Sequence, residues 1–163
     1  MAKSQSNMTR DEAALRSRRY LALANAYERA ASAMADSPEF ERLRLPFFAA
    51  LAQALELALK AAIARGGCDD ERLLLLGHDL VRCWDFARAD TDIAKGPAEG
   101  IARVIDRLAA PHQAQAFRYP TLLSWPLQDP REALCAVHAL LKVDPGYPST
   151  FSEPVVSRVE TPG

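Results

Sequence analysis

The stretch from Leu45 to Ile63 is the most apolar part of the chain, and it constrains the fold more than any other feature. Its leucine, alanine and phenylalanine residues cover almost every face of the helix that they predict, which is typical of a helix at the centre of a fold. Only Gln53, Glu56 and Lys60 interrupt this surface beyond Pro46. Because a charge at the middle of a bilayer costs roughly 2.5–3.5 kcal/mol, the stretch predicts a buried core helix and not a membrane span.

The residues around this core helix include signals that start and end helices. Thr9 and Glu12 form a T-x-x-E capping box, which predicts the start of a first helix. Residues at helical spacing follow: Leu15, Leu23, Ala26, Ala30 and Ala33. Ser37-Pro38 predicts the start of the second helix, with serine as its cap, and Gly66-Gly67 predicts its end. Pro46 predicts a kink or a break inside the second helix.

The second half of the chain predicts further helices. The segment 69–76 is ambiguous, and a third main helix is expected over 78–89, with Leu80, Cys83, Trp84 and Ala87 on one face. A fourth is expected to open at Gly96-Pro97 and to end before Pro111, with Ile101, Val104, Ile105 and Leu108 inward. The segment 112–128 is expected to be an ordered loop. A fifth helix is expected from Asp129-Pro130, with Leu134, Val137, Leu140 and Leu141 inward.

No segment alternates with the period of a β-strand, so we expect an all-α protein, an antiparallel four- to five-helix bundle. The bundle is expected over 9–143, with 1–8 and 144–163 as flexible or loosely packed termini, since four of the last 19 residues are proline.

Composition narrows the function classes. The chain has 20 basic and 21 acidic residues, so its net charge of -1 exerts no overall attraction on nucleic acid or an anionic membrane, although a local basic patch is compatible with it. The three cysteines form no CxxC pair, and no HExxH, GxSxG or glycine-rich phosphate loop is present, so no metal site and no cofactor are predicted. No signal peptide is recognisable at the start, and a cytoplasmic location is expected.

The polar residues of the second helix form one narrow stripe. Gln53, Glu56 and Lys60 fall within roughly 60° of one another around the helix axis, and Glu56 and Lys60 have the favourable order for an ion pair. The stripe either faces water or forms a buried seam against a neighbouring helix. The breadth of the surrounding apolar surface favours the seam, packed against the helix that begins at Gly77-His78.

Two further clusters could carry chemistry. In Gly77-His78-Asp79-Leu80, Asp79 is placed to cap a helix, and His78 is either structural or a neutral imidazole that acts as a general base. In Arg118-Tyr119-Pro120, proline restricts the backbone of Tyr119. Arg118 could bind a phosphate or pair with Glu56 or Asp79; the alternative is a structural loop anchored by Tyr119 and Trp125.

Three segments together, LAQALELALKAAIARGG, LLLLGHDLVRCWDFA and FRYP, resemble the HEPN superfamily (higher eukaryotes and prokaryotes nucleotide-binding). Its members are small helical bundles with an E-L-x-L-K core helix and a G-H-D-L helix start. The resemblance covers 45–120 and implies a homodimer. It also implies an interaction module that associates with RNA or nucleotide in a bacterial-type stress or defence system, with an antitoxin or nucleotidyltransferase as a partner.

Active HEPN members are metal-independent RNases with an R-x(4–6)-H motif at the dimer cleft. Arg72 and His78 match this spacing, and the resemblance implies that His78 would deprotonate the 2′-hydroxyl while Arg72 would hold the scissile phosphate. The alternative is that His78 and Asp79 cap the helix and hold the Glu56–Lys60 seam. A third possibility is a structural bundle that recruits a partner protein.

Overall fold

The computed structural model describes residues 9–90, 98–119 and 124–142, and within these ranges all regular structure is helical. Two long helices come first, α1 (Arg10–Ala35) and α2 (Phe40–Arg65). They are followed by a short α3 (Asp70–Leu75), then α4 (Leu80–Asp90), α5 (Ala98–Gln113) and α6 (Pro130–Lys142). The predicted all-α bundle is confirmed. The expected termini, 1–8 and 144–163, and the expected opening at Gly96-Pro97 lie outside the described residues.

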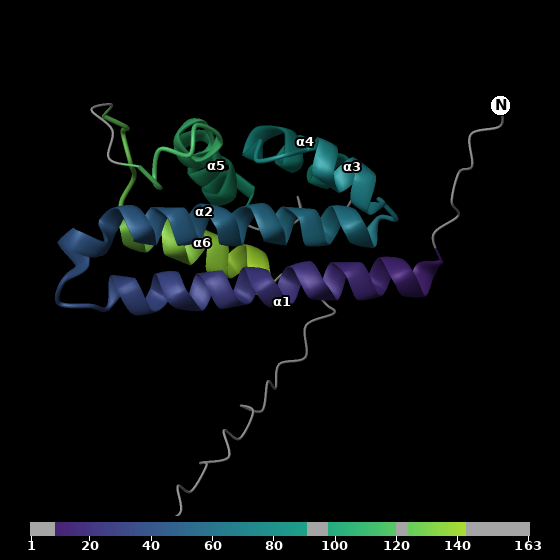
Figure 1. The fold of residues 1–163 in the computed structure, drawn as a ribbon, viewed down its shortest axis with the longest axis horizontal. Coiled ribbons are helices and arrows are strands. Elements are labelled where there is room, and N and C mark those ends of the chain that lie inside the picture. The colour runs from purple at the N-terminus through teal and green to yellow at the C-terminus, as the bar shows by residue number, and fades with distance from the viewer. Residues whose placement is uncertain (1–8, 91–97, 120–123, 143–163) are drawn as a thin grey trace, which may run out of the picture.

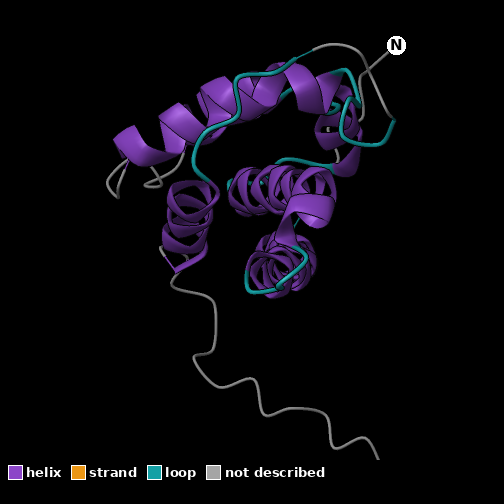
Figure 2. Cartoon of the chain, turned by 90° about the vertical axis from the view of Figure 1, so that its left-hand side faces the viewer, coloured by secondary structure: helices purple, strands orange, loops and turns teal. Residues whose placement is uncertain are grey.

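The helices α1 and α2 form an antiparallel hairpin, and theirs is the most extensive contact between any two of the described helices (Figure 1). On the side of α2 away from α1 lie α3, α4 and α5, whereas α6 packs against both long helices. Figure 2, turned by 90°, shows α5 lengthwise while the hairpin is seen nearly end-on, so α5 crosses the hairpin steeply. The core helix α2 is therefore enclosed by other helices.

The central position predicted for α2 is confirmed. Sixteen of its residues are buried, and they include Phe47, Phe48, Leu51, Leu55, Leu59 and Ile63. By length and composition α2 is the one described helix that could cross a membrane, but 83% of its apolar window is buried inside the protein. Its hydrophobicity is accounted for by packing.

The prediction for the start of α2 is wrong. The Ser37 hydroxyl accepts a hydrogen bond from the Glu39 N–H at 3.2 Å inside a turn, and the helix begins only at Phe40. The predicted break at Pro46 is also absent, since α2 continues through it. Arg42 and Pro46 are both exposed, so the carbonyl that loses its helical donor has access to water.

The helix predicted from Thr9 is present, with both hydrogen bonds of the Thr9–Glu12 capping box. However, the residues singled out at helical spacing lie on its exposed side: Leu15, Leu23, Ala26, Ala30 and Ala33. The buried side carries Ala13, Ser17, Leu21, Ala24, Glu28 and Ala31. Small side chains on this face allow α1 to approach α2 closely along much of its length, which a count of leucines does not detect.

The remaining predicted faces are largely confirmed. The inward residues of α4 and α5 are buried as expected, and so are Val137, Leu140 and Leu141 of α6, with Leu134 partly buried against them. The ambiguous segment 69–76 contains α3, which Asp69 caps by accepting a hydrogen bond from the Arg72 N–H. The predicted end of α5 before Pro111 is wrong, because the helix continues to Gln113 and thereby includes His112.

Candidate functional site

Glu56 lies at the centre of a buried polar network on α2. Its side chain is almost fully enclosed, with a residue exposure of 2%, and Lys60, one turn later, has an exposure of 8%. Lys60 Nζ donates to Glu56 Oε1 at 2.7 Å and to the Gly77 carbonyl at 2.8 Å. Of the two interpretations of the polar stripe, the buried seam is confirmed for Glu56 and Lys60, whereas Gln53 is half-buried.

Two imidazole rings converge on the other oxygen of the same carboxylate. His78 Nδ1 lies 2.9 Å and His112 Nε2 lies 2.7 Å from Glu56 Oε2. The rings meet edge to face, with centroids 5.7 Å apart. If Glu56 is ionised, each ring places an N–H at this oxygen, so His78 is the Nδ1–H tautomer and His112 the Nε2–H tautomer when they are neutral.

The local sequence explains how each histidine reaches Glu56. Gly77 has a positive φ of 57°, a conformation that favours glycine, and it lies in the turn between α3 and α4. Asp79 then caps α4 by accepting a hydrogen bond from the Arg82 N–H at 3.0 Å. His78 therefore lies just outside the helix, and its side chain is half-exposed, with 48% of its surface accessible. The capping role expected of Asp79 is confirmed.

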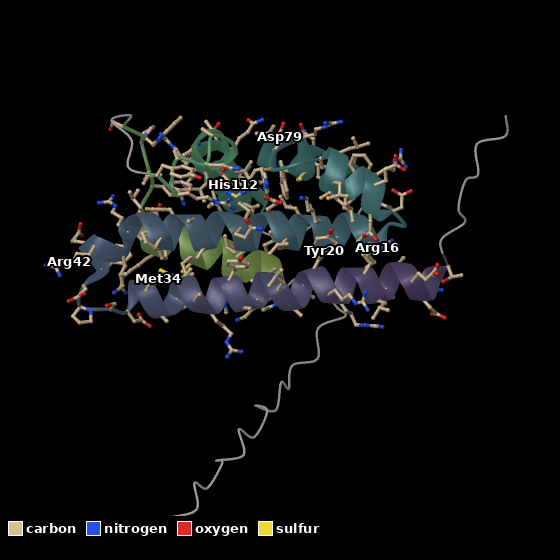
Figure 3. All side chains as sticks on the ribbon, in the orientation of Figure 1. Arg16, Tyr20, Met34, Arg42, Asp79 and His112 are labelled. Atoms are coloured by element: carbon tan, nitrogen blue, oxygen red, sulfur yellow. The ribbon has the colours of Figure 1, made fainter. Side chains whose placement is uncertain are left out.

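His112 comes from the last turn of α5. Figure 3 labels it in the space between α5 and α2, and it is buried. The turn that follows closes with Gln115 at φ 53° and an Ala116 N–H to Pro111 carbonyl hydrogen bond of 2.8 Å. This turn directs the chain back over the site and places Phe117 and Arg118 next to the histidines.

The network controls the ionisation of Glu56. Burial raises the pKa of this carboxyl group, but hydrogen bonds from His112, Lys60 and His78, together with the charge of Lys60, outweigh it. They hold the pKa at about 2, below its ordinary value of 4.5. Glu56 is therefore an anion at neutral pH in the middle of the fold.

A small hollow lies beside the two histidines. Its volume is about 30 Å³, which exceeds the roughly 10–15 Å³ that one water molecule needs and is too small for a nucleobase. It is lined by Ala49, Gln53, His78, His112, Gln115, Phe117 and Arg118. The hollow is thus lined by residues from the predicted polar stripe, from the Gly77-His78-Asp79-Leu80 cluster and from the loop after α5.

The other predicted site residues lie apart from this network. Arg72 is an exposed residue of α3, and among the described contacts none joins its side chain to His78. Among the described contacts Arg118 makes no ion pair with Glu56 or Asp79, and both phosphate binding and a structural role in its loop stay predictions. Tyr119 is exposed and does not anchor its loop, and Pro120 lies outside the described residues.

Sequence reasoning missed His112, which had no recognisable partner. The available signal was its register: His112 follows Leu108 by four residues and Ile105 by seven, so it continues the inward face of α5. Helical spacing also places Glu28 on the buried face of α1, four residues after Ala24, and there it contacts His138 Nδ1 of α6 at 3.2 Å. In both cases a polar residue lies on an apolar face and meets a polar partner from a distant helix.

Comparisons with protein-family models, with curated proteins and with solved structures found no match to this chain.

Proposed function

We propose that the chain is an RNA- or nucleotide-associated module of HEPN-like type, and that it contacts a phosphate group at the mouth of the hollow beside His78. The observation that carries this proposal is that the half-exposed His78 and the exposed Arg118 line the same hollow. The arginine N–H groups are suitable donors to a phosphate oxygen, and so is the Nε2–H that His78 carries when its ring is protonated. The small volume of the hollow favours contact with the backbone of RNA, not recognition of a base.

The roles of the buried groups follow from the same geometry. Glu56 fixes the orientation of the His78 ring through Nδ1, which leaves Nε2 for a ligand. Lys60 and His112 complete the hydrogen bonding of the carboxylate, so its charge is compensated inside the protein and not by the ligand. In this proposal Glu56, Lys60 and His112 are positioning residues, whereas His78 and Arg118 contact the phosphate.

The test is the binding of a fluorescently labelled single-stranded RNA by the full chain, measured by anisotropy in the presence of EDTA at several salt concentrations. We expect Arg118→Ala to weaken binding about tenfold or more, because a hydrogen bond to a charged group is worth roughly 1.5–3 kcal/mol. The slope of log affinity against log salt should also fall by about 1.

Arg42→Ala is the control, since Arg42 is an exposed arginine at the first turn of α2, next to the hairpin turn (Figure 3). It should bind RNA like the unmodified chain. Equal loss of binding in both arginine variants would indicate unspecific attraction to positive charge. No binding at all, together with copurification of a particular protein, would favour the scaffold alternative.

A metal-independent RNase is the second candidate, and the Glu56–His78 hydrogen bond favours it, because a carboxylate that orients an imidazole is a common arrangement for a general base. His78 Nε2 would remove the proton of the 2′-hydroxyl, and Arg72 would hold the phosphate. Among the described contacts none joins Arg72 to His78, and in this candidate the two residues would meet the phosphate at the dimer cleft. RNA cleavage that is lost in both Arg72→Ala and His78→Ala would support it, and cleavage that survives either change would contradict it.

We also propose that the chain forms a homodimer. Two consecutive leucines of α3, Leu74 and Leu75, are 75% and 68% exposed, and exposed Leu15 and Leu23 line a groove of about 420 Å³ along α1. Exposed apolar residues of this kind are typical of interaction surfaces. Sedimentation should find a dimer that Leu74→Ser with Leu75→Ser dissociates; a monomeric unmodified chain would contradict this. The HEPN resemblance supports a defence role with an antitoxin or nucleotidyltransferase partner, and a cytoplasmic location stays an expectation from the sequence.

A further inference from the structure

We propose that Glu56, His78 and His112 form a binding site for one divalent transition-metal ion, with Zn²⁺ as the reference ion. One ligand atom from each residue is available, namely Glu56 Oε2, His78 Nδ1 and His112 Nε2, and these atoms all lie within 4.8 Å of one another. Two imidazoles and one carboxylate, with a water molecule in the fourth position, are a common ligand set of zinc sites that keep an open coordination position.

The distances fit such an ion with small movements. The carboxylate oxygen lies 2.9 Å from His78 Nδ1 and 2.7 Å from His112 Nε2. Ligands that each stand about 2.0–2.2 Å from Zn²⁺ in tetrahedral geometry are separated by about 3.3–3.5 Å. The two rings therefore need to withdraw by several tenths of an ångström. The half-exposed His78 can do so by rotating its side chain toward solvent.

The surroundings provide the supporting contacts of a metal site. Lys60 binds the other carboxylate oxygen at 2.7 Å, so Glu56 is held in place and offers Oε2 as a single ligand atom. The adjacent hollow of about 30 Å³ has room for a water molecule in the open position. Gln53 and Gln115 line this hollow and supply polar groups near that water molecule.

Charge and protons set the conditions for binding. Glu56 and Lys60 together are neutral, so the metal enters without the full attraction of an isolated carboxylate, and imidazole coordination supplies most of the affinity. Binding at His78 Nδ1 and His112 Nε2 requires that the proton of each neutral ring moves to its other nitrogen, so a neutral ring changes its tautomer and releases no proton to solvent. His78 then carries its proton on Nε2, where it acts as a hydrogen-bond donor. The inference goes beyond the proposed RNA contact and does not depend on it.

The experiment is a titration of the EDTA-treated, dialysed full chain with Zn²⁺ alone, without RNA, followed by calorimetry. We expect one saturable site and a rise in thermal stability with Zn²⁺ concentration. His78→Ala should weaken binding by about 100-fold or more, because loss of even a supporting contact of a metal site costs 10–100-fold. Since 48% of the His78 side chain is accessible, this variant should fold.

His138→Ala is the matched control: its side chain is 51% accessible and also contacts a buried glutamate, Glu28, but it is not part of the cluster. It should bind Zn²⁺ like the unmodified chain. Co²⁺ bound to the unmodified chain should give the visible absorption of a four-coordinate site. Absence of a saturable site, unchanged binding in His78→Ala, or loss of binding in His138→Ala would overturn the proposal. Because RNA binding is measured in EDTA, the two proposals can fail independently.

Discussion

Lys60→Met should be among the most damaging single substitutions in this protein. Methionine fills a similar volume, so packing is largely preserved, but the buried Glu56 anion loses its only described lysine partner, 2.7 Å away. The Gly77 carbonyl loses its donor at 2.8 Å as well. Removing one member of a buried ion pair costs about 3–5 kcal/mol, because the charge that remains is left in a poorly solvating environment.

Two hydrogen bonds from His78 and His112 stay with Glu56 in this variant, which places our expectation at the lower end of that range, about 3 kcal/mol. The measurement is urea denaturation at neutral pH, followed by far-UV circular dichroism. Lys142→Met is the control, since Lys142 is an exposed lysine in the last turn of α6. It should change the free energy of unfolding by less than about 0.5 kcal/mol.

The double variant Glu56→Gln with Lys60→Met separates charge from packing. Because it removes both charges and keeps an acceptor for the two rings, it should be more stable than Lys60→Met alone. A loss below about 1 kcal/mol for Lys60→Met, similar to that of an exposed pair, would refute the buried seam. A double variant whose loss of stability, relative to the unmodified chain, equals the sum of the losses in Glu56→Gln and Lys60→Met would refute it as well.

Three further outcomes are expected. Gly77→Ala should destabilise the protein by about 1–2 kcal/mol in the same urea assay, because φ at Gly77 is 57° and a residue with a Cβ is strained there. Gly100→Ala should instead stabilise it by about 0.4–1 kcal/mol, since Gly100 lies inside α5 and its added Cβ would stand 3.9 Å from Ala136 Cβ. The folded-state pKa of Glu56 lies below its ordinary value, so the stability that its ionised form contributes is fully present above pH 4.5 and is lost as the pH falls toward about 2. Acidification should therefore lower the free energy of unfolding of the unmodified chain by about 3 kcal/mol more than that of Glu56→Gln. Equal losses in the two proteins would contradict this. A thiol reagent should label exposed Cys135 rapidly and Cys83 only after unfolding, since burial raises the pKa of Cys83 to about 12, and rapid labelling of both in the native state would disagree with the structure.

The sequence was sufficient to predict the elements whose signals are local. The capping box at Thr9 and the Gly66-Gly67 stop act within a few residues, and both occur as expected. The burial of α2 also followed from its own composition, because a helix that is apolar on nearly all sides has to be enclosed. The seam between Glu56 and the helix start at Gly77-His78 could be predicted for the same reason.

The predictions were wrong where a contact with another part of the fold decides where a helix ends or which of its faces is buried. Pro111 was interpreted as a helix stop, but a proline removes only one helical hydrogen bond, and α5 continues to Gln113. His112 has no partner that is recognisable in the sequence, so the predicted site did not include it. On α1, the leucines suggested one face, whereas the contact with α2 selects the face with small side chains. The buried face of α1 is not visible without the partner helix, whereas the register of α5 indicates in the sequence itself that His112 faces inward.

The network around Glu56 links the fold and the site because its donors come from separate elements. Lys60 belongs to α2 itself, His78 to the turn before α4, and His112 to the end of α5. Any rearrangement of α4 or α5 on α2 would break a contact to this buried anion, so the carboxylate favours one arrangement of the helices over others. A purely structural role would, however, be served by buried donors alone. His78 is the exception, since it adds a half-exposed ring that faces a hollow. Substituting it should therefore affect ligand or metal binding much more than the free energy of unfolding, whereas substituting Lys60 should affect stability first.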